Sequence, residues 1–182
     1  RLSVVLPAYD EERHIAQAVR GFQSLGVVDE IVVVDNNSTD RTADIASQAG
    51  ARVVRETRQG YGYACQRALR EATGDLIVLA EPDGTFMGKD LFKLLAYADD
   101  FQLVLGTRTS RLFIWKGANM GCLLRWGNWA VAKLLQVLFN GPSLTDVGCT
   151  MRLIHRGALQ AIQESLTVGG SHFLPEMTIL AL

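Results

Sequence analysis

Two carboxylates separated by one residue stand out in the chain: Glu81 and Asp83, in the stretch LIVLAEPDGTF. An apolar, strand-like run precedes them and Gly84 follows. Hard divalent cations such as Mg²⁺ and Mn²⁺ take oxygen ligands, commonly one or two carboxylates plus substrate phosphates. The pair could therefore hold a metal that neutralises a departing diphosphate. Pro-Asp-Gly is also a common β-turn sequence, and taken alone the stretch is more typical of an acidic turn.

Two other loops place polar side chains directly after apolar runs. Tyr9 and Glu11 follow the first run in VVLPAYDEE, and Asp35 closes the next run in EIVVVDNNSTD. A carboxylate at such a strand end can accept hydrogen bonds from a base or from a ribose hydroxyl. Asp35 could instead form an Asx-turn before a helix, for which Ser38 or Asp40 is a suitable N-cap. The residues of the first loop could likewise be capping residues of the first helix.

A third candidate contact is the stretch RETRQGYGYA, which sets Arg55 and Arg58 beside Gly60 and Gly62, just before a helical pattern. Glycines let a backbone approach a diphosphate, and both cations and a helix N-terminus favour its negative charge. A plain flexible turn explains the same pattern equally well. The stretch is thus either a diphosphate contact or a turn.

Strands and helices alternate along the chain and would position these loops. We expect strands at 2–7, 30–35, 51–56, 75–80 and 102–108, and helices at 11–25, 39–50 and 62–74. This pattern predicts an α/β fold, with a Rossmann-like, mostly parallel sheet and helices on both faces. Ligands of such sheets bind at the carboxyl ends of the strands. The loops at Tyr9, Asp35 and Asp83 would therefore converge on one site.

The composition of the 182 residues, 48% hydrophobic and 20% charged, indicates a single globular domain spanning residues 1–182. The formal net charge of −1 gives no reason to expect a nucleic acid partner. Cys65, Cys122 and Cys149 lack paired spacing, which favours reduced thiols in the cytoplasm. The chain stops inside the apolar pattern FLPEMTILAL, so we expect a C-terminal continuation. No uncharged apolar run reaches the roughly 18 residues of a membrane-spanning helix.

Residues 113–139 predict a long helix with two different faces. One face is an apolar stripe, and the other carries Arg125, Trp126, Trp129 and Lys133. An aromatic and basic face suits a membrane interface, where tryptophan lies at headgroup depth and cations meet phosphates. A helix buried on two sides explains the pattern equally well.

Taken together, the motifs resemble those of the family-two glycosyltransferases, which have the GT-A fold. The stretches that carry the resemblance are VVLPAYDEE, EIVVVDNNSTD, RQGYGYACQRALREATGDLIVLAEPDGTF, LGTR and LTDVGCTMRLI, in the family's order and across nearly the whole chain. Dolichol- and polyprenyl-phosphate mannosyl- and glucosyltransferases are the most similar subgroup. The resemblance implies the nucleotide-diphospho-sugar transferase version of the predicted sheet.

By position, the resemblance assigns a nucleotide-sugar site. It comprises Pro7, Ala8, Tyr9, Glu11, Asp35, Arg58, Gly60, Glu81 and Asp83. Asp83 would be the principal ligand of Mg²⁺ or Mn²⁺, and Glu81 would contact the metal or the donor. The chain departs from the family's Asp-x-Asp at Glu81, whose side chain is one methylene longer. It also reads DNNS where the family has Asp-Asp-Gly-Ser, so Asn36 and Asn37 replace Asp and Gly.

On the acceptor side, Arg108 in LGTR and Arg125 resemble the basic residues that hold an acceptor phosphate. Asp146 and Arg152 fall where the family shapes the acceptor region. Asp83 and Arg108 would carry catalysis, the first through the metal and the second by orienting the nucleophile. Asp146 is the candidate base if the acceptor is a hydroxyl group rather than a phosphate.

The implied reaction is inverting, metal-dependent transfer of a hexose from a GDP- or UDP-hexose to a polyprenyl phosphate. It would take place at the cytoplasmic face of a membrane, to which the chain would bind peripherally. A soluble or glycan acceptor and a non-catalytic nucleotide-sugar-binding domain remain alternatives. A nucleotidyltransferase would need a glycine-rich Gly-x-Gly-Thr-Arg loop after the first strand, where this chain has LPAYDEE.

Overall fold

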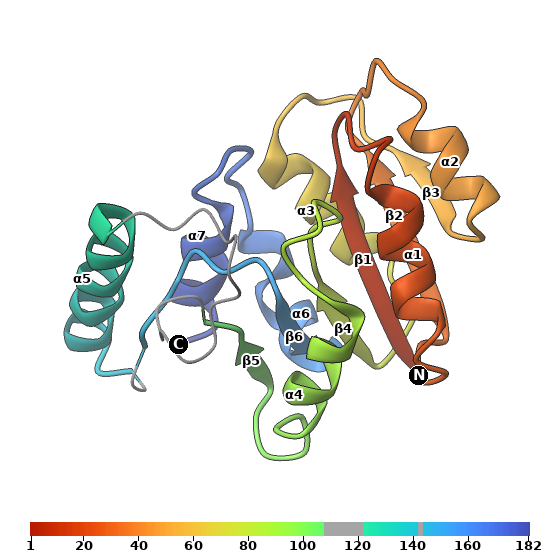
Figure 1. The fold of residues 1–182 in the computed structure, drawn as a ribbon. Coiled ribbons are helices and arrows are strands. Elements are labelled where there is room, and N and C mark those ends of the chain that lie inside the picture. The colour runs from red at the N-terminus through yellow and green to blue at the C-terminus, as the bar shows by residue number, and fades with distance from the viewer. Residues whose placement is uncertain (108–121, 142–143) are drawn as a thin grey trace.

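The computed structural model describes residues 1–107, 122–141 and 144–182. Its described part contains a six-stranded sheet in the order β3-β2-β1-β4-β6-β5 (Figure 1). The strands are β1 Leu2–Ala8, β2 Glu30–Asp35, β3 Arg52–Arg55, β4 Leu76–Leu79, β5 Leu103–Leu105 and β6 Arg152–His155. The first four pair in parallel, and β6 runs antiparallel to both β4 and β5. The predicted mostly parallel α/β sheet is confirmed.

Helices cover both faces of this sheet (Figure 1). One face packs against α1 Ile15–Gln23, α2 Thr42–Gln48 and α4 Leu91–Leu95, and the other against α3 Tyr61–Glu71, α6 Arg156–Ile162 and α7 Phe173–Leu180. Short 3₁₀ turns at Gly88–Asp90 and Gln163–Ser165 complete these connections. Because successive strand residues point to opposite faces, the buried run of β1 places Val4 and Leu6 in one cluster and Val5 in the other. Burial on both faces explains the uninterrupted apolar runs.

The remaining helix, α5 Cys122–Leu138, lies beside α7 at one end of the molecule (Figure 1). Ala132 and Leu135 pack into a small cluster with Leu144 and Val147. Trp126 and Val137, by contrast, are 61% and 79% exposed. The alternative of a helix buried on two sides is therefore wrong for the side chains that the structure describes. None of the helices in the described ranges is long and apolar enough to cross a membrane.

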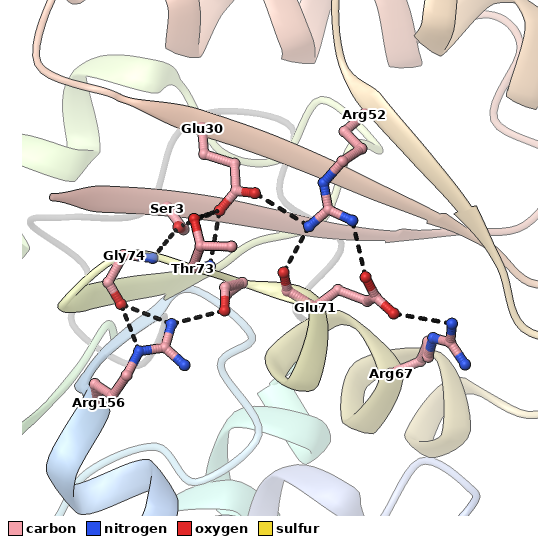
Figure 2. Close-up of polar contacts among 9 residues, drawn as sticks. Ser3, Glu30, Arg52, Arg67, Glu71, Thr73, Gly74 and Arg156 are labelled. Carbon is pink, nitrogen blue, oxygen red and sulfur yellow. Dashed lines mark hydrogen bonds and ion pairs between the residues drawn. The ribbon is translucent and has the colours of Figure 1, made fainter.

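A polar network ties together the amino ends of the strands, at the edge of the sheet opposite the predicted site (Figure 2). Glu30 accepts hydrogen bonds from the Ser3 hydroxyl at 2.6 Å, the Thr73 backbone N–H at 2.9 Å and the Arg52 guanidinium at 3.0 Å. Arg52 also bonds the Glu71 carboxylate at 2.8 Å. Burial alone would raise the pKa of Glu30, but these donors outweigh it and lower the pKa from 4.5 to about 2.

We expect the free energy of unfolding of Glu30→Gln to depend less on pH in the acid range than that of the wild type. The folded-state pKa of Glu30 is lower than its unfolded value, so its contribution is complete above pH 4.5 and is lost as pH falls towards 2. The wild type should lose about 2 kcal/mol more unfolding free energy than the variant across this window. Urea denaturation at several pH values measures the difference, with Glu164→Gln, an exposed carboxylate, as the control. Identical pH profiles for wild type and Glu30→Gln would contradict the assignment.

Candidate active site

Two hollows lie at the carboxyl ends of the parallel strands. The first, which we call the Tyr9 pocket, has a volume of about 200 Å³ and is lined by Pro7, Ala8, Tyr9, Asn36, Gln59, Tyr61 and Ala64. The second, which we call the acidic pocket, has a volume of about 400 Å³ and is lined by Asp10, Glu11, Glu12, Arg13, His14, Asp40 and Asp83. The structure thus brings predicted residues from the ends of β1 and β4 to one edge of the sheet.

The loops that follow β1 and β2 are tied to each other. Asp10 has a left-handed backbone, with φ of 53°, and its Oδ1 accepts a hydrogen bond from the Thr39 N–H at 2.7 Å. The Glu11 N–H donates to the Thr42 hydroxyl at 2.7 Å. The Glu11 carboxylate itself contacts only the His14 ring, at 3.3 Å, among the side chains described. Asp10 therefore shapes the loop, and Glu11 presents its carboxylate to the acidic pocket.

At the end of β2, Asp35 is buried, and its Oδ1 accepts a hydrogen bond from the Ser38 N–H at 3.2 Å. This is the Asx-turn that the sequence allowed, and it uses one carboxylate oxygen. The N-cap prediction is wrong: α2 begins at Thr42, and neither Ser38 nor Asp40 is its cap residue. Asp40 instead accepts from the Thr42 N–H at 2.9 Å, inside the first turn.

Asn36 fastens the next loop. Its side-chain amide donates to the carbonyl groups of Glu56 and Arg58 at 3.0 and 2.8 Å, and its Oδ1 accepts from the Gly60 N–H at 2.9 Å. An aspartate has no N–H donors and could not make the first two bonds. Asn36 therefore has a structural role, because it fixes the backbone of residues 56–60 beside the Tyr9 pocket.

Arg58 is held on the surface beside this pocket. Its guanidinium contacts the Glu56 carboxylate at 3.2 Å and lies 4.5 Å from the centre of the Tyr63 ring. Burial would raise the pKa of Glu56, but the hydrogen bonds and charge of Arg58 lower it. Arg58 is thus a preorganised cation at the edge of the predicted donor site, with part of its charge balanced by Glu56.

The two glycines before α3 have a role that the diphosphate interpretation did not include. The N–H groups of Gly62 and Tyr63, at the start of α3, both donate to the Gly169 carbonyl, at 2.9 and 3.3 Å. A Cβ at Gly60 would collide with the Gly169 carbonyl, and one at Gly62 with the Val168 carbonyl. The N–H groups of Gly62 and Tyr63 are therefore bonded within the chain itself, whereas the contacts of Arg58 and Gly60 with the donor stay predictions. The glycines permit the close approach of residues 168–170.

The carboxylate pair follows β4. Asp83 Oδ1 accepts hydrogen bonds from the Thr85 N–H at 2.9 Å and the Thr85 hydroxyl at 2.6 Å, and Gly84 has φ of 80°. The stretch is therefore a turn, as the local sequence suggested, and the turn fixes one oxygen of Asp83. Its Oδ2 has no hydrogen bond to the described residues, and the side chain lines the acidic pocket. The same residues can therefore form a turn and also belong to the candidate site.

Glu81 is half-buried, and its Oε1 accepts a hydrogen bond from the Thr150 hydroxyl at 2.8 Å. Glu81 and Asp83 offer hard oxygen donors on one strand-end turn, which fits Mg²⁺ or Mn²⁺ held by carboxylates and substrate phosphates. No three His, Cys, Asp or Glu side chains within the described ranges gather into a metal site made of protein groups alone. Asp83 and Glu81 are the residues that would hold the ion.

On the acceptor side, the structure places two of the four predicted residues. Asp146 is buried, and its Oδ1 accepts from the Gly148 N–H at 3.0 Å. The Arg152 side chain is fully buried and donates to the carbonyl groups of Val147, Cys149 and Leu174, so its role in the fold is structural. Arg108 lies outside the described residues, as does the side chain of Arg125 within α5.

Sequence reasoning missed two site residues, Tyr61 and Thr150. Tyr61 lines the Tyr9 pocket, and its hydroxyl lies 3.0 Å from that of Thr150. Both residues fall inside the motifs RQGYGYACQ and LTDVGCTMRLI, which is the only signal that could have drawn attention to them. Their separation of 89 positions hides the contact from any spacing rule.

A mostly parallel α/β sheet with carboxylates and pockets at the carboxyl ends of its strands is an arrangement typical of nucleotide-binding α/β proteins. The family described as Glycosyl transferase family 2 matches residues 3–163 of the chain. The chain therefore belongs to glycosyltransferase family 2. The resemblance noted in the sequence is confirmed, and so is the fold it implied.

Relatives support the same family. The low-salt glycan biosynthesis hexosyltransferase Agl6 of Haloferax volcanii is 33% identical over 99% of this chain and 44% of its own length. The dolichyl-phosphate hexose transferase of the same organism is 33% identical over 92% of this chain and 72% of its own length. The chain thus spans less than half of the first relative.

Solved structures include glucosyl-3-phosphoglycerate synthase from Mycobacterium tuberculosis in complex with Mn²⁺, uridine-diphosphate-glucose and phosphoglyceric acid. It superimposes with a TM-score of 0.75 at 25% identity, over 98% of this chain and 63% of that one. The shared GT-A fold extends across nearly the whole of the present chain.

Proposed function

We propose that the chain transfers a hexose from a nucleotide-diphosphate sugar to a polyprenyl phosphate, with inversion and with a divalent metal. The observation that carries the proposal is that the neighbouring strands β1, β2 and β4 end in Tyr9, Asp35 and Asp83 at one edge of the sheet, with Tyr9 in the lining of the Tyr9 pocket and Asp83 in that of the acidic pocket. The similarity to a dolichyl-phosphate hexose transferase supports the lipid acceptor. The Mn²⁺ and UDP-glucose of the mycobacterial synthase support the metal and the donor class.

In this proposal the donor nucleotide lies in the Tyr9 pocket. Pro7, Ala8 and Tyr9 line this pocket. Asp35, at the end of the neighbouring strand, accepts from the base or ribose through the oxygen that its Asx-turn leaves free. Glu11 and Gly60 border the bound donor, and Arg58 meets its diphosphate. Arg58 is already ordered by Glu56 and Tyr63, so binding costs little additional side-chain entropy.

Asp83 and Glu81 would hold Mg²⁺ or Mn²⁺ at the donor diphosphate. The metal supplies Lewis-acid stabilisation of the negative charge on the leaving nucleoside diphosphate. Asp83 is suited to this task because Thr85 fixes one of its oxygens and leaves the other exposed to the acidic pocket.

An acceptor phosphate is largely ionised at neutral pH, so its attack on the sugar needs no dedicated general base. Arg108 and Arg125 orient this phosphate and offset its repulsion from the donor. Asp146 is buried, which suits a role in shaping the acceptor region more than proton abstraction from a mobile hydroxyl. An inverting phosphate acceptor fits these residues best.

The exposed face of α5 supports a peripheral contact with the cytoplasmic face of a membrane. Its described side chains include Trp126 and Trp129, whose rings pack edge to face at 5.8 Å, and exposed Leu134, Val137 and Leu138. Tryptophan and aliphatic side chains on one helix suit the headgroup region of a bilayer. A lipid phosphate would then reach the site from that surface.

A screen of UDP- and GDP-hexoses for Mn²⁺-dependent binding, followed by transfer to a short polyprenyl phosphate, tests the proposal. Phosphoglyceric acid serves as the soluble acceptor, because it accompanies the mycobacterial synthase. Transfer to the lipid alone supports the proposal, whereas transfer to phosphoglyceric acid alone establishes the second candidate, a soluble-acceptor enzyme. Binding of a nucleotide sugar without turnover on any acceptor would identify a non-catalytic binding domain.

We expect Arg108→Ala to impair the acceptor step selectively. Loss of one charged contact to the acceptor phosphate should lower kcat/KM for polyprenyl phosphate by about tenfold. The dissociation constant of the donor, measured by calorimetry, should stay within about twofold of wild type because the residue would not touch the nucleotide. Arg70→Ala, at an exposed position on α3, is the control. Equal losses in donor binding and transfer would contradict the assignment.

A further inference from the structure

The Glu81 carboxylate is held by a chain of hydroxyl groups from two other parts of the fold. Its Oε1 lies 2.8 Å from the Thr150 hydroxyl, which lies 3.0 Å from that of Tyr61 at the start of α3. We infer that Thr150 and Tyr61 are positioning residues that orient Glu81 towards the divalent metal of the donor site. The inference rests on the proposed function and extends it to two residues that act on the metal through Glu81.

The number of protons on each group fixes which group donates each hydrogen bond. Glu81 is a carboxylate and can only accept, so the single hydroxyl proton of Thr150 is donated to it. The Tyr61 hydroxyl must then donate to the oxygen of Thr150, because that threonine has no second proton. Each group therefore has one available role, and the chain ends on Glu81.

Burial keeps this direction fixed. Thr150 is 1% exposed, so water cannot compete for its hydrogen bonds. Burial also raises the pKa of the Tyr61 hydroxyl. This hydroxyl consequently keeps its proton at neutral pH and remains a donor. The Thr150 hydroxyl therefore always donates its hydrogen bond to Glu81.

The chain leaves half of the Glu81 carboxylate available. Oε1 accepts from Thr150, whereas Oε2 has no hydrogen bond to the residues that the structure describes. A carboxylate held by one oxygen has a defined direction for the other, as in metal sites whose ligands are oriented by neighbouring groups. Asp83 is held in the same way, by the N–H and hydroxyl of Thr85. Each carboxylate of the pair therefore accepts a hydrogen bond from one threonine hydroxyl.

The glutamate also matches the position of Thr150. An aspartate at position 81 would be one methylene shorter, and its oxygens would fall short of a hydroxyl that now lies 2.8 Å away. Thr150 cannot easily move to follow it, because Arg152 fixes the preceding carbonyl of Cys149 at 2.7 Å. Glu81 and Thr150 therefore act as a matched pair, and the departure from Asp-x-Asp has a structural partner.

Thr150→Val tests the inference, because valine keeps the shape of threonine and removes the hydroxyl. We expect the dissociation constant of Mn²⁺, titrated by calorimetry in the presence of UDP and, in parallel, GDP, to rise about 10- to 100-fold. Nucleotide affinity without metal should not change. Thr150→Ser should restore Mn²⁺ affinity. Thr178→Val is the matched control, since this buried threonine donates to the Leu174 carbonyl instead.

A double-mutant cycle sharpens the test. If Glu81→Asp already breaks the contact, then adding Thr150→Val should change Mn²⁺ affinity by less than about twofold. Should Thr150→Val fail to fold, Tyr61→Phe takes its place, because it removes only the hydroxyl that donates to Thr150. A weaker Mn²⁺ affinity in that variant, with unchanged nucleotide affinity in the absence of metal, supports the inference. An unchanged Mn²⁺ affinity, or an equal loss of nucleotide affinity without metal, overturns it.

The remaining outcomes separate the inference from the proposed function. Mn²⁺ affinity in folded Thr150→Val within about twofold of wild type overturns the inference and leaves the proposed function standing. An equal loss in Thr178→Val also overturns it, because general destabilisation would then explain the effect. If the unmodified chain shows no Mn²⁺-dependent binding of UDP or GDP, the proposed function fails and the inference fails with it.

Discussion

Replacing Asp83 with asparagine should lower turnover by about 100-fold or more without changing the melting temperature. The amide oxygen of asparagine can still accept the hydrogen bonds of Thr85 that shape the turn. The substitution removes the negative charge facing the acidic pocket, and with it the principal ligand proposed for the metal. Removing one preorganised stabiliser of transition-state charge typically costs about 10²–10³ in kcat. Steady-state rates at saturating Mn²⁺, together with thermal unfolding, measure both effects.

Asp100→Asn is the control for this prediction, since Asp100 is an exposed carboxylate in the turn that follows α4. It should leave both the rate and the unfolding unchanged. A second comparison is the Mn²⁺ concentration needed for half-maximal rate, which should rise for Asp83→Asn alone. Full turnover by Asp83→Asn at the Mn²⁺ requirement of the wild type would remove Asp83 from the metal site.

The sequence predicted the parallel part of the sheet well, because β1, β2 and β4 are buried on both faces and read as continuous apolar runs. It did not predict β6, whose four residues begin with Arg152 and end with His155. It also missed α7, which buries Phe173, Leu174 and Met177 and lacks a polar side of regular period. Both elements depend on packing partners far along the chain rather than on a local pattern.

The candidate site also has features that the sequence could predict and features that it could not. The convergence of the loops after β1, β2 and β4 follows from parallel topology, so the sequence could predict it. The hydrogen bonds from the start of α3 to the Gly169 carbonyl could not be predicted, because nothing in RQGYGYA indicates a partner so far along the chain. The same holds for the hydroxyl chain at Glu81. Spacing rules describe neighbours within one element, whereas these contacts join different elements.

Replacing Arg152 with methionine should lower the free energy of unfolding by about 3–5 kcal/mol. The guanidinium is buried and donates to the carbonyl groups of Cys149 at 2.7 Å, Leu174 at 3.0 Å and Val147 at 3.4 Å. Methionine fills much of the volume but leaves these acceptors without a donor. Relief of the buried charge offsets part of this loss, since burial already lowers the pKa of Arg152.

Arg156→Met is the matched control for the substitution at Arg152. Arg156 also donates to backbone carbonyl groups, those of Ala72 and Gly74, at 2.7 and 2.8 Å (Figure 2). It is only partly buried, so water can replace its hydrogen bonds, and we expect a loss of about 1 kcal/mol. Urea denaturation of the two variants compares them directly. If both variants lose the same free energy of unfolding, the deeper burial of Arg152 does not explain its contribution to stability.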